Sequence, residues 1–223
     1  MSSNPARYDA IADWYVEFSR DWDTEPRALL PADLRGQRVL DLACAYGTAS
    51  RYLAQRGARV TGLDISGRLL SRARELEAGQ PLGVRYIQGD AAAADWWDGE
   101  PFDGVLCNMA LMDIDDLDGT LSTVAAVLAP GGWFSFSVVH PCYPGGPEGS
   151  LSGLPSWPPD GGYAREGRWS TGGEGVRGRA GVNHRMLSTY LNAVLRAGLV
   201  LEELAERGTS VPVALMVRCR RAG

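Results

Sequence analysis

The chain has 223 residues, of which 45% are hydrophobic and 22% are charged, and its formal net charge at pH 7 is −5. This composition excludes an intrinsically disordered chain, and the length allows one domain, residues 1–223, whose core needs neither a disulfide nor a structural metal. The mild acidic excess argues against a protein that follows nucleic-acid phosphates.

The first predicted element is an amphipathic helix near the N-terminus. Its apolar side chains recur at helical spacing, so one face is expected to dock on the rest of the domain. These side chains are Tyr8, Ile11, Ala12, Tyr15 and Phe18. A turn at residues 31–36 separates this helix from the first predicted strand.

Five short apolar runs of the buried-strand type come next and alternate with helical segments. We predict strands at residues 38–43, 58–64, 83–88, 102–108 and 133–139. We predict helices at residues 47–56, 68–78 and 117–128, with a short one at 91–97. Because each strand is apolar enough to be covered on both faces, the pattern predicts a mostly parallel sheet with helices on either side, joined by right-handed crossovers.

Residues 141–182 break this alternation with a segment rich in glycine and proline. A loop of this length is usually functional or disordered. Its aromatic residues predict a lid insertion over a binding site, although aromatics that merely anchor a surface loop are the alternative. They are Tyr143, Trp157, Tyr163 and Trp169.

A helix at residues 184–197 and an antiparallel hairpin of strands at 199–206 and 212–220 are predicted to close the chain. The predicted fold class is therefore α/β, with a doubly wound, Rossmann-like sheet of seven mostly parallel strands.

Acidic residues lie at the ends of three successive predicted strands. In an open α/β sheet, ligands bind beyond the carboxyl ends of the strands, where the strand order reverses. The first strand runs into Asp41-Leu42-Ala43-Cys44-Ala45-Tyr46-Gly47, whose small residues let a ligand approach the backbone. Asp64 ends the second strand, where it can accept hydrogen bonds from ribose hydroxyls, and Asp90 follows the third, where it can accept one from an exocyclic amine. The three acids predict a nucleoside pocket.

Taken in order, these motifs resemble those of the class I S-adenosylmethionine-dependent methyltransferases, in particular a small bacterial type related to quinone-biosynthesis methyltransferases. The matching segments are residues 8–15, 39–47, 60–66, 89–91, 102–105 and 128–132, and the resemblance covers essentially the whole chain. It implies capping helices over residues 1–36. It also implies transfer of a methyl group from S-adenosylmethionine to a small-molecule acceptor, in bacterial secondary or quinone-like metabolism.

The resemblance also implies roles for individual residues in holding the cofactor. The loop from Ala43 to Gly47, which follows Asp41 in the chain, would pass under the methionine part. Asp64 would hold the ribose, and Ile65 would pack on the adenine. Asp90 and the Ala91 amide would contact the adenine edge.

The remaining implied contacts come from two other parts of the chain. The backbone at Asn108 and Met109 would meet the amino-acid end of the cofactor. Tyr15 and Tyr8 would close the pocket, unless they are only core contacts of their helix. Ala43 and Ala45 stand where the family usually has glycine, so a methyl group is expected either to crowd the cofactor or to alter the turn.

A base is needed only for a hydroxyl-like acceptor, and two histidines are candidates. His140 follows the fifth strand, where it could instead cap the strand end. His184 could instead be an ordinary residue at a helix start. Whether oxygen, nitrogen or carbon is methylated stays open.

Metal, targeting and membrane signals are weak in the sequence. The four cysteines form no C-x-x-C pair and only two histidines are present, so we expect no metal site and reduced thiols. The first 15 residues carry charges where a signal peptide needs an apolar core, and no apolar run approaches the ~20 residues that span a bilayer. We therefore expect a cytoplasmic monomer or homodimer with no membrane or nucleic-acid partner.

Two other functions fit the fold. A nicotinamide-dependent oxidoreductase would share the sheet and the acid after the second strand, but it should show G-x-G-x-x-G, which this loop lacks. A protein that binds S-adenosylmethionine without transferring its methyl group is the other alternative.

Overall fold

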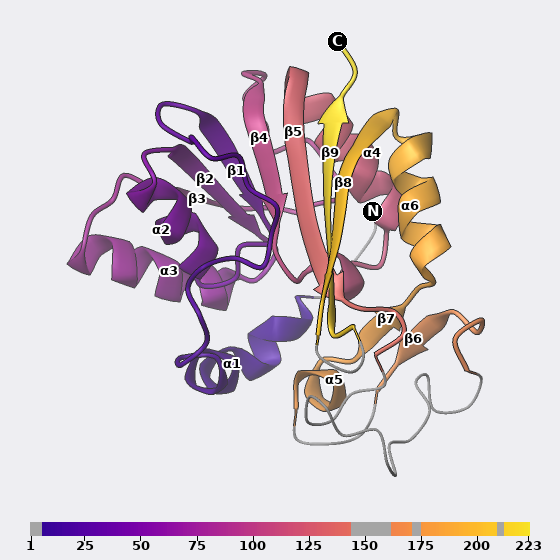
Figure 1. Cartoon of the computed structure of the whole chain (residues 1–223). Coiled ribbons are helices and arrows are strands. Elements are labelled where there is room, and N and C mark those ends of the chain that lie inside the picture. Colours follow the sequence, from indigo (N-terminus) through magenta and orange to yellow (C-terminus); the bar gives the residue numbers. More distant parts are fainter. Residues whose placement is uncertain (1–5, 144–161, 171–174, 209–211) are drawn as a thin grey trace.

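The computed structural model describes residues 6–143, 162–170, 175–208 and 212–223. Its main feature is a seven-stranded sheet with strand order β3-β2-β1-β4-β5-β9-β8 (Figure 1). The strands are β1 (Arg38–Leu42), β2 (Arg59–Asp64), β3 (Arg85–Gln88), β4 (Phe102–Cys107), β5 (Leu128–Val139), β8 (Leu199–Arg207) and β9 (Ala214–Arg221). The first five are parallel, and β9 runs antiparallel between β5 and β8. The predicted α/β class, the mostly parallel sheet and the C-terminal hairpin are confirmed.

Helices precede or follow most strands of the sheet. The longer ones are α2 (Thr48–Gln55), α3 (Gly67–Gly79), α4 (Leu117–Val127) and α6 (Leu187–Arg196). Side chains supply missing hydrogen bonds at two helix starts, where the hydroxyl of Ser66 accepts from the Leu69 amide and the carboxylate of Asp116 accepts from the Gly119 amide. The strand order reverses between β1 and β4, which is where this type of sheet binds its ligands.

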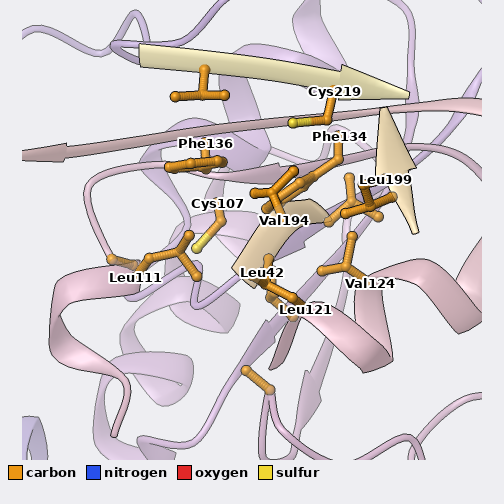
Figure 2. Close-up of a cluster of buried hydrophobic side chains, with 14 of the residues drawn as sticks. Leu42, Cys107, Leu111, Leu121, Val124, Phe134, Phe136, Val194, Leu199 and Cys219 are labelled. Carbon is orange, nitrogen blue, oxygen red and sulfur yellow. The ribbon is translucent and has the colours of Figure 1, made fainter. Parts of the chain in front are cut away.

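Two hydrophobic clusters cover the two faces of the sheet. Successive residues of a strand point to opposite faces: in β4, Val105 belongs to the larger cluster and Leu106 to the smaller one, which includes Leu53 of α2. The larger cluster includes Val124 of α4, and Val194 of α6 lies beside Phe134 of β5 (Figure 2). The central strands are thus buried on both sides, so their carboxyl-end edge is left to form a site.

Short elements gather at that carboxyl-end edge. They are η1 (Arg7–Ile11), α1 (Ala12–Phe18), η2 (Leu111–Asp113), β6 (Gly167–Trp169), α5 (Val176–Arg179) and β7 (Val182–His184). Figure 1 shows α1 and the group of α5, β6 and β7 beyond the ends of the parallel strands. The predicted N-terminal helix is therefore present as a 3-10 turn followed by an α-helix.

Three local predictions were wrong. Residues 91–97 form turns rather than a helix, because the Asp90 carboxylate accepts from the Ala92 amide and the Trp96 indole donates to the Asp90 carbonyl. His184 lies in β7 rather than at a helix start, because β7 pairs with β6. β5 begins at Leu128, five residues before the predicted start.

The segment 141–182 is only partly described. Its described residues contain β6, α5 and the start of β7, while residues 144–161 and 171–174, with Trp157, lie outside the described residues. The lid therefore stays a prediction. In the part of the chain that the structure describes, no helix is both long enough and apolar enough to cross a bilayer.

Candidate active site

A cavity of about 750 Å³ lies at the carboxyl-end edge of the sheet. This volume falls within the usual range for pockets that hold small molecules and cofactors. The predicted cofactor residues line it, with one exception. Those that do are Tyr8, Tyr15, Asp41, Ala43, Ala45, Asp64, Ile65, Asp90, Ala91, Asn108 and Met109. Residues far apart in the sequence thus share one hollow.

The loop after β1 makes the floor of this cavity. Ala43 and Ala45 both adopt positive φ angles, of 60° and 52°. The Cys44 amide donates to the Leu63 carbonyl at 2.9 Å, and the Ala45 amide donates to the Asp64 carboxylate at 2.8 Å. The left-handed conformation costs an L-residue roughly 1–2 kcal/mol. The alanines therefore keep the turn that glycine would adopt easily, held there by hydrogen bonds to β2.

Gly47 does not line the cavity but is required behind it. Its φ is 85°, and a Cβ atom at this position would lie 2.2 Å from the Tyr86 hydroxyl oxygen. This glycine precedes the first residue of α2. Its lack of a side chain lets β3 pack against the loop, so its contribution to the site is indirect.

Asp64 joins the loop to the end of β2. One carboxylate oxygen accepts from the Ala45 amide and the other from the Ser66 amide, each at 2.8 Å. Burial raises the pKa of Asp64, while these two amide hydrogen bonds act against that rise. Each carboxylate oxygen can accept more than one hydrogen bond. Asp64 is thus held rigidly and keeps acceptor capacity for two hydroxyls in the cavity.

Asp41 in β1 and Asp90 after β3 occupy different environments, on either side of β2. Asp41 is 1% exposed and accepts a 2.6 Å hydrogen bond from the Ser50 hydroxyl, and burial raises its pKa to about 7. Asp90 accepts from the Ala92 amide at 2.9 Å, and it lines the cavity together with Leu63 and Ile65. This places a polar group beside apolar walls, which suits the edge and faces of a purine.

The backbone after β4 is also constrained. Met109 has a φ of 55°, and its amide donates to the Ser137 hydroxyl at 2.9 Å. That hydroxyl in turn donates to the Asn108 side-chain oxygen at 3.0 Å. A left-handed methionine is uncommon and persists only where its surroundings hold it. The turn directs both residues into the cavity.

Comparisons with known proteins agree with this geometry. A family model described as a methyltransferase domain matches residues 39–132. The crystal structure of an S-adenosylmethionine-dependent methyltransferase from Mesorhizobium loti is 30% identical, covers 96% of this chain and 99% of that one, and has a TM-score of 0.71. The chain belongs to the S-adenosylmethionine-dependent methyltransferases. The family inferred from the motifs, and its cofactor, are therefore confirmed.

Two further comparisons limit what this membership implies. The ubiquinone biosynthesis O-methyltransferase of Stutzerimonas stutzeri is 38% identical over 109 residues, which are 48% of this chain and 46% of that protein. The chain spans about half the length of the curated relatives that it matches. The crystal structure of the [4+2]-cyclase SpnF is 17% identical, covers 96% of this chain and 81% of that one, and has a TM-score of 0.64, which shows a shared fold alone.

The residues of this methyltransferase fit its cofactor. Asp64 has acceptor capacity for ribose hydroxyls, Asp90 stands beside apolar walls that match adenine, and the small residues Ala43 and Ala45 line the cavity as well. The cavity also extends past these residues toward η1 and α5, since Tyr8 and Arg177 line it. Its walls therefore reach beyond the residues expected to hold the nucleoside.

Tyr8 and Tyr15 line the part of the cavity that extends toward η1 and α5. Their rings meet edge to face, with centroids 5.0 Å apart. The η1 turn that carries Tyr8 is tied to α3, because the Asp9 carboxylate accepts from the Ser66 hydroxyl and the Arg68 amide. Both tyrosines line the cavity, and this location favours a ligand contact over a role in the core alone.

The two histidines lie outside this cavity. The His140 ring accepts at Nδ1 from the Cys142 amide at 3.1 Å, so its Nε2 carries the proton of the neutral ring and donates to Glu206 at 2.8 Å. The His184 Nε2 lies 2.8 Å from the Tyr163 carbonyl oxygen. Both side chains are buried and neither is among the residues that line the large cavity. A base role for either stays a prediction.

Sequence reasoning did not assign several charged residues that line the cavity, among them Asp113 of η2 and Arg177 of α5. Asp113 lies after the fourth strand, in the largely apolar stretch 109–114. A carboxylate in such an apolar stretch could have indicated a functional residue. Arg177 lies in the glycine-rich segment, where no periodicity indicates which residues face inward.

Proposed function

We propose that this methyltransferase transfers the methyl group of S-adenosylmethionine to a small, fairly apolar acceptor. The observation that carries the proposal is the single cavity, which continues from the strand-end acids Asp64 and Asp90 to a wall of apolar and aromatic side chains. That wall includes Tyr8, Tyr15 and Val182.

Each end of the cavity has a separate task. When bound, S-adenosylmethionine supplies an electrophilic methyl group on a sulfonium. The Asp64 carboxylate holds the ribose, and Asp90 with the Ala91 amide contacts the adenine edge. The loop at Ala43 and Ala45 passes under the methionine part, while Asn108 and Met109 meet the amino-acid end. The tyrosines of η1 and α1 exclude water and hold the acceptor in line with the methyl group, which is the protein's main contribution to such a displacement.

The segment 141–182 completes the acceptor end in this proposal. Its described residues Val176, Arg177, Gly181 and Val182 line the cavity, which supports its role as a lid. The curated O-methyltransferase relatives support a small acceptor from secondary or quinone-like metabolism. The monomer or homodimer state stays a prediction.

Labelled methyl transfer tests the proposal. The wild-type protein should bind S-adenosylhomocysteine in calorimetry and, with radiolabelled S-adenosylmethionine, should label a small-molecule acceptor. Labelling restricted to a macromolecule would contradict it.

A second candidate function is binding of S-adenosylmethionine without methyl transfer. The likeness in fold to a [4+2]-cyclase supports keeping this candidate, because one fold can host unrelated reactions. Tight binding with no label transferred to any acceptor would favour it. A nicotinamide-dependent oxidoreductase is not a candidate, because the chain belongs to the S-adenosylmethionine-dependent methyltransferases.

A further inference from the structure

A partly accessible carboxyl group, Asp113, lines the acceptor end of the cavity. Its Oδ2 accepts a hydrogen bond from the Tyr8 hydroxyl at 3.1 Å. Burial and the charge of Asp113 raise the pKa of Tyr8 well above its usual value, so this hydroxyl keeps its proton and donates. The bond orients the Asp113 carboxylate from the N-terminal side.

Neighbouring elements hold the backbone that carries Asp113. The Arg185 guanidinium donates to the carbonyls of Leu111, Ile114 and Asp115 at 2.7–3.0 Å. The Asn183 amide donates to the Ile114 carbonyl as well, at 3.2 Å. From the other side, Arg7 donates to the Asp113 carbonyl at 2.7 Å. The turn η2 is thus fixed by η1 and by the segment from β7 to α6.

Burial and the charged groups around Asp113 change its pKa in opposite directions. Arg7 of η1, Arg168 of β6 and Arg177 of α5 lower its pKa, but burial dominates and raises it to about 7. The other titratable groups nearby have their own partners or stay protonated. Arg7 also donates to both oxygens of the Asp115 carboxylate at 2.8 Å, and Arg185 donates to backbone carbonyls. Burial raises the pKa of Tyr15, so its hydroxyl keeps its proton. A carboxyl group that exchanges its proton near neutral pH therefore faces the cavity.

We propose that Asp113 is a catalytic residue and that the acceptor is a hydroxyl compound of the phenol class, whose proton passes to the Asp113 carboxylate while Tyr8 holds that carboxylate in position. The inference deepens the function proposed above and rests on it. The aromatic wall of Tyr8 and Tyr15 suits a flat ring, and the carboxylate suits its hydroxyl.

The proposed step balances. The acceptor O–H bond breaks and its proton joins an oxygen of Asp113, while an oxygen lone pair forms the new bond to the methyl carbon. The electron pair of the broken carbon–sulfur bond stays on sulfur, which becomes a neutral thioether. The carboxylic acid then returns its proton to water. No further reactant is needed.

The test uses the full chain with two phenols, catechol and the more acidic 4-nitrocatechol, and radiolabelled S-adenosylmethionine. Asp113→Asn should lower kcat/KM for catechol by about 100-fold, a typical loss when a general base is removed. It should lower kcat/KM for 4-nitrocatechol by less than about 10-fold, because this phenol ionises without help. The exposed Asp95 supplies a matched control, Asp95→Asn, which should leave both values unchanged.

The pH profile separates catalysis from a merely structural role. Only the ionised carboxylate can accept a proton, so wild-type kcat/KM for catechol should rise with pH up to about 7 and then level off. Asp113→Asn should lose this rise, and Tyr8→Phe should shift it. Independently of activity, Asp113→Asn should remove one of the two carbon-13 carboxyl resonances that titrate near pH 7 in the wild type and should leave the one of Asp41.

Each contrary outcome is distinct. Equal losses for the two phenols, or a larger loss in His140→Gln than in Asp113→Asn, would overturn the inference. A wild-type protein that binds S-adenosylhomocysteine but methylates neither phenol would overturn it too, while leaving transfer to another acceptor standing. Failure to bind S-adenosylhomocysteine at all would overturn the proposed function itself.

Discussion

The cofactor end and the acceptor end of the cavity are built in different ways. At the cofactor end, the loops after β1 and β2 bond directly to each other, as when the Ala45 amide donates to Asp64. At the acceptor end, Tyr8, Asp113 and Arg177 come from three remote segments. Side-chain hydrogen bonds fix the segment that carries Asp113, where Arg185 donates to three carbonyls of residues 111–115.

This difference separates two kinds of functional information. The carboxyl ends of neighbouring parallel strands must lie side by side, so short motifs there already imply a shared site. No such rule joins an N-terminal turn to a glycine-rich segment about 170 residues later. Changes at the cofactor end should therefore alter binding of the cofactor product, whereas changes at the acceptor end should spare it.

The largest effect is expected at Gly47. Gly47→Ala would place a Cβ atom against the Tyr86 hydroxyl and force alanine to a φ of 85°, so the free energy of unfolding should fall by about 3 kcal/mol. Urea denaturation measures this fall in the free energy of unfolding. Gly36→Ala is the matched control, since Gly36 also has a positive φ but no atom within 4 Å of the added Cβ. Equal losses in the two variants would contradict the role assigned to close packing.

The next effect is expected at Asp64. In Asp64→Asn one side-chain oxygen is replaced by an NH₂ group, which would face the amide of Ala45 or Ser66. The affinity for S-adenosylhomocysteine should fall by about 30-fold, or about 2 kcal/mol, in calorimetry. Asp113→Asn, at the other end, should change that affinity by less than about twofold. If both variants lose affinity equally, the two ends are not separate.

A smaller loss of stability is expected at Arg185. Arg185→Ala removes charge-assisted hydrogen bonds to three carbonyls, so the free energy of unfolding should fall by about 1.5 kcal/mol and phenol turnover should fall with it. Affinity for S-adenosylhomocysteine should stay within about twofold of the wild type. The comparison variant is Arg196→Ala, which breaks an exposed ion pair with Asp118 and should cost about 0.5 kcal/mol.

The smallest effect is a gain of stability at Ala45. Ala45→Gly relieves the strain of a φ of 52°, roughly 1–2 kcal/mol, but glycine adds freedom to the unfolded chain that offsets about half of it. The free energy of unfolding should therefore rise by about 0.5 kcal/mol. Ala49→Gly, within α2, should instead lower it by about 0.5–1 kcal/mol. A loss of stability in Ala45→Gly would show that the turn is not strained.

Prediction from sequence succeeded where the controlling interactions are local or repeat regularly. The apolar runs 38–43 and 58–64 become β1 and β2, since such runs can only be buried between two layers of helices. It failed at residues 91–97, where the Asp90 and Trp96 side chains form hydrogen bonds that compete with a helix. At His184, pairing with a strand some 15 residues earlier outweighed the helical pattern that continues from Leu187.

The amino-acid sequence alone was enough to predict the parallel sheet, the C-terminal hairpin, the family and most of the strand-end residues that line the cavity, because strand burial and strand-end turns depend on neighbouring residues. Tertiary contacts were needed to show that His140 has both ring nitrogens engaged outside the large cavity and that Asp113 faces into it. Burial and the choice of hydrogen-bond partner depend on distant segments, here Glu206 for the histidine and Tyr8 for the aspartate.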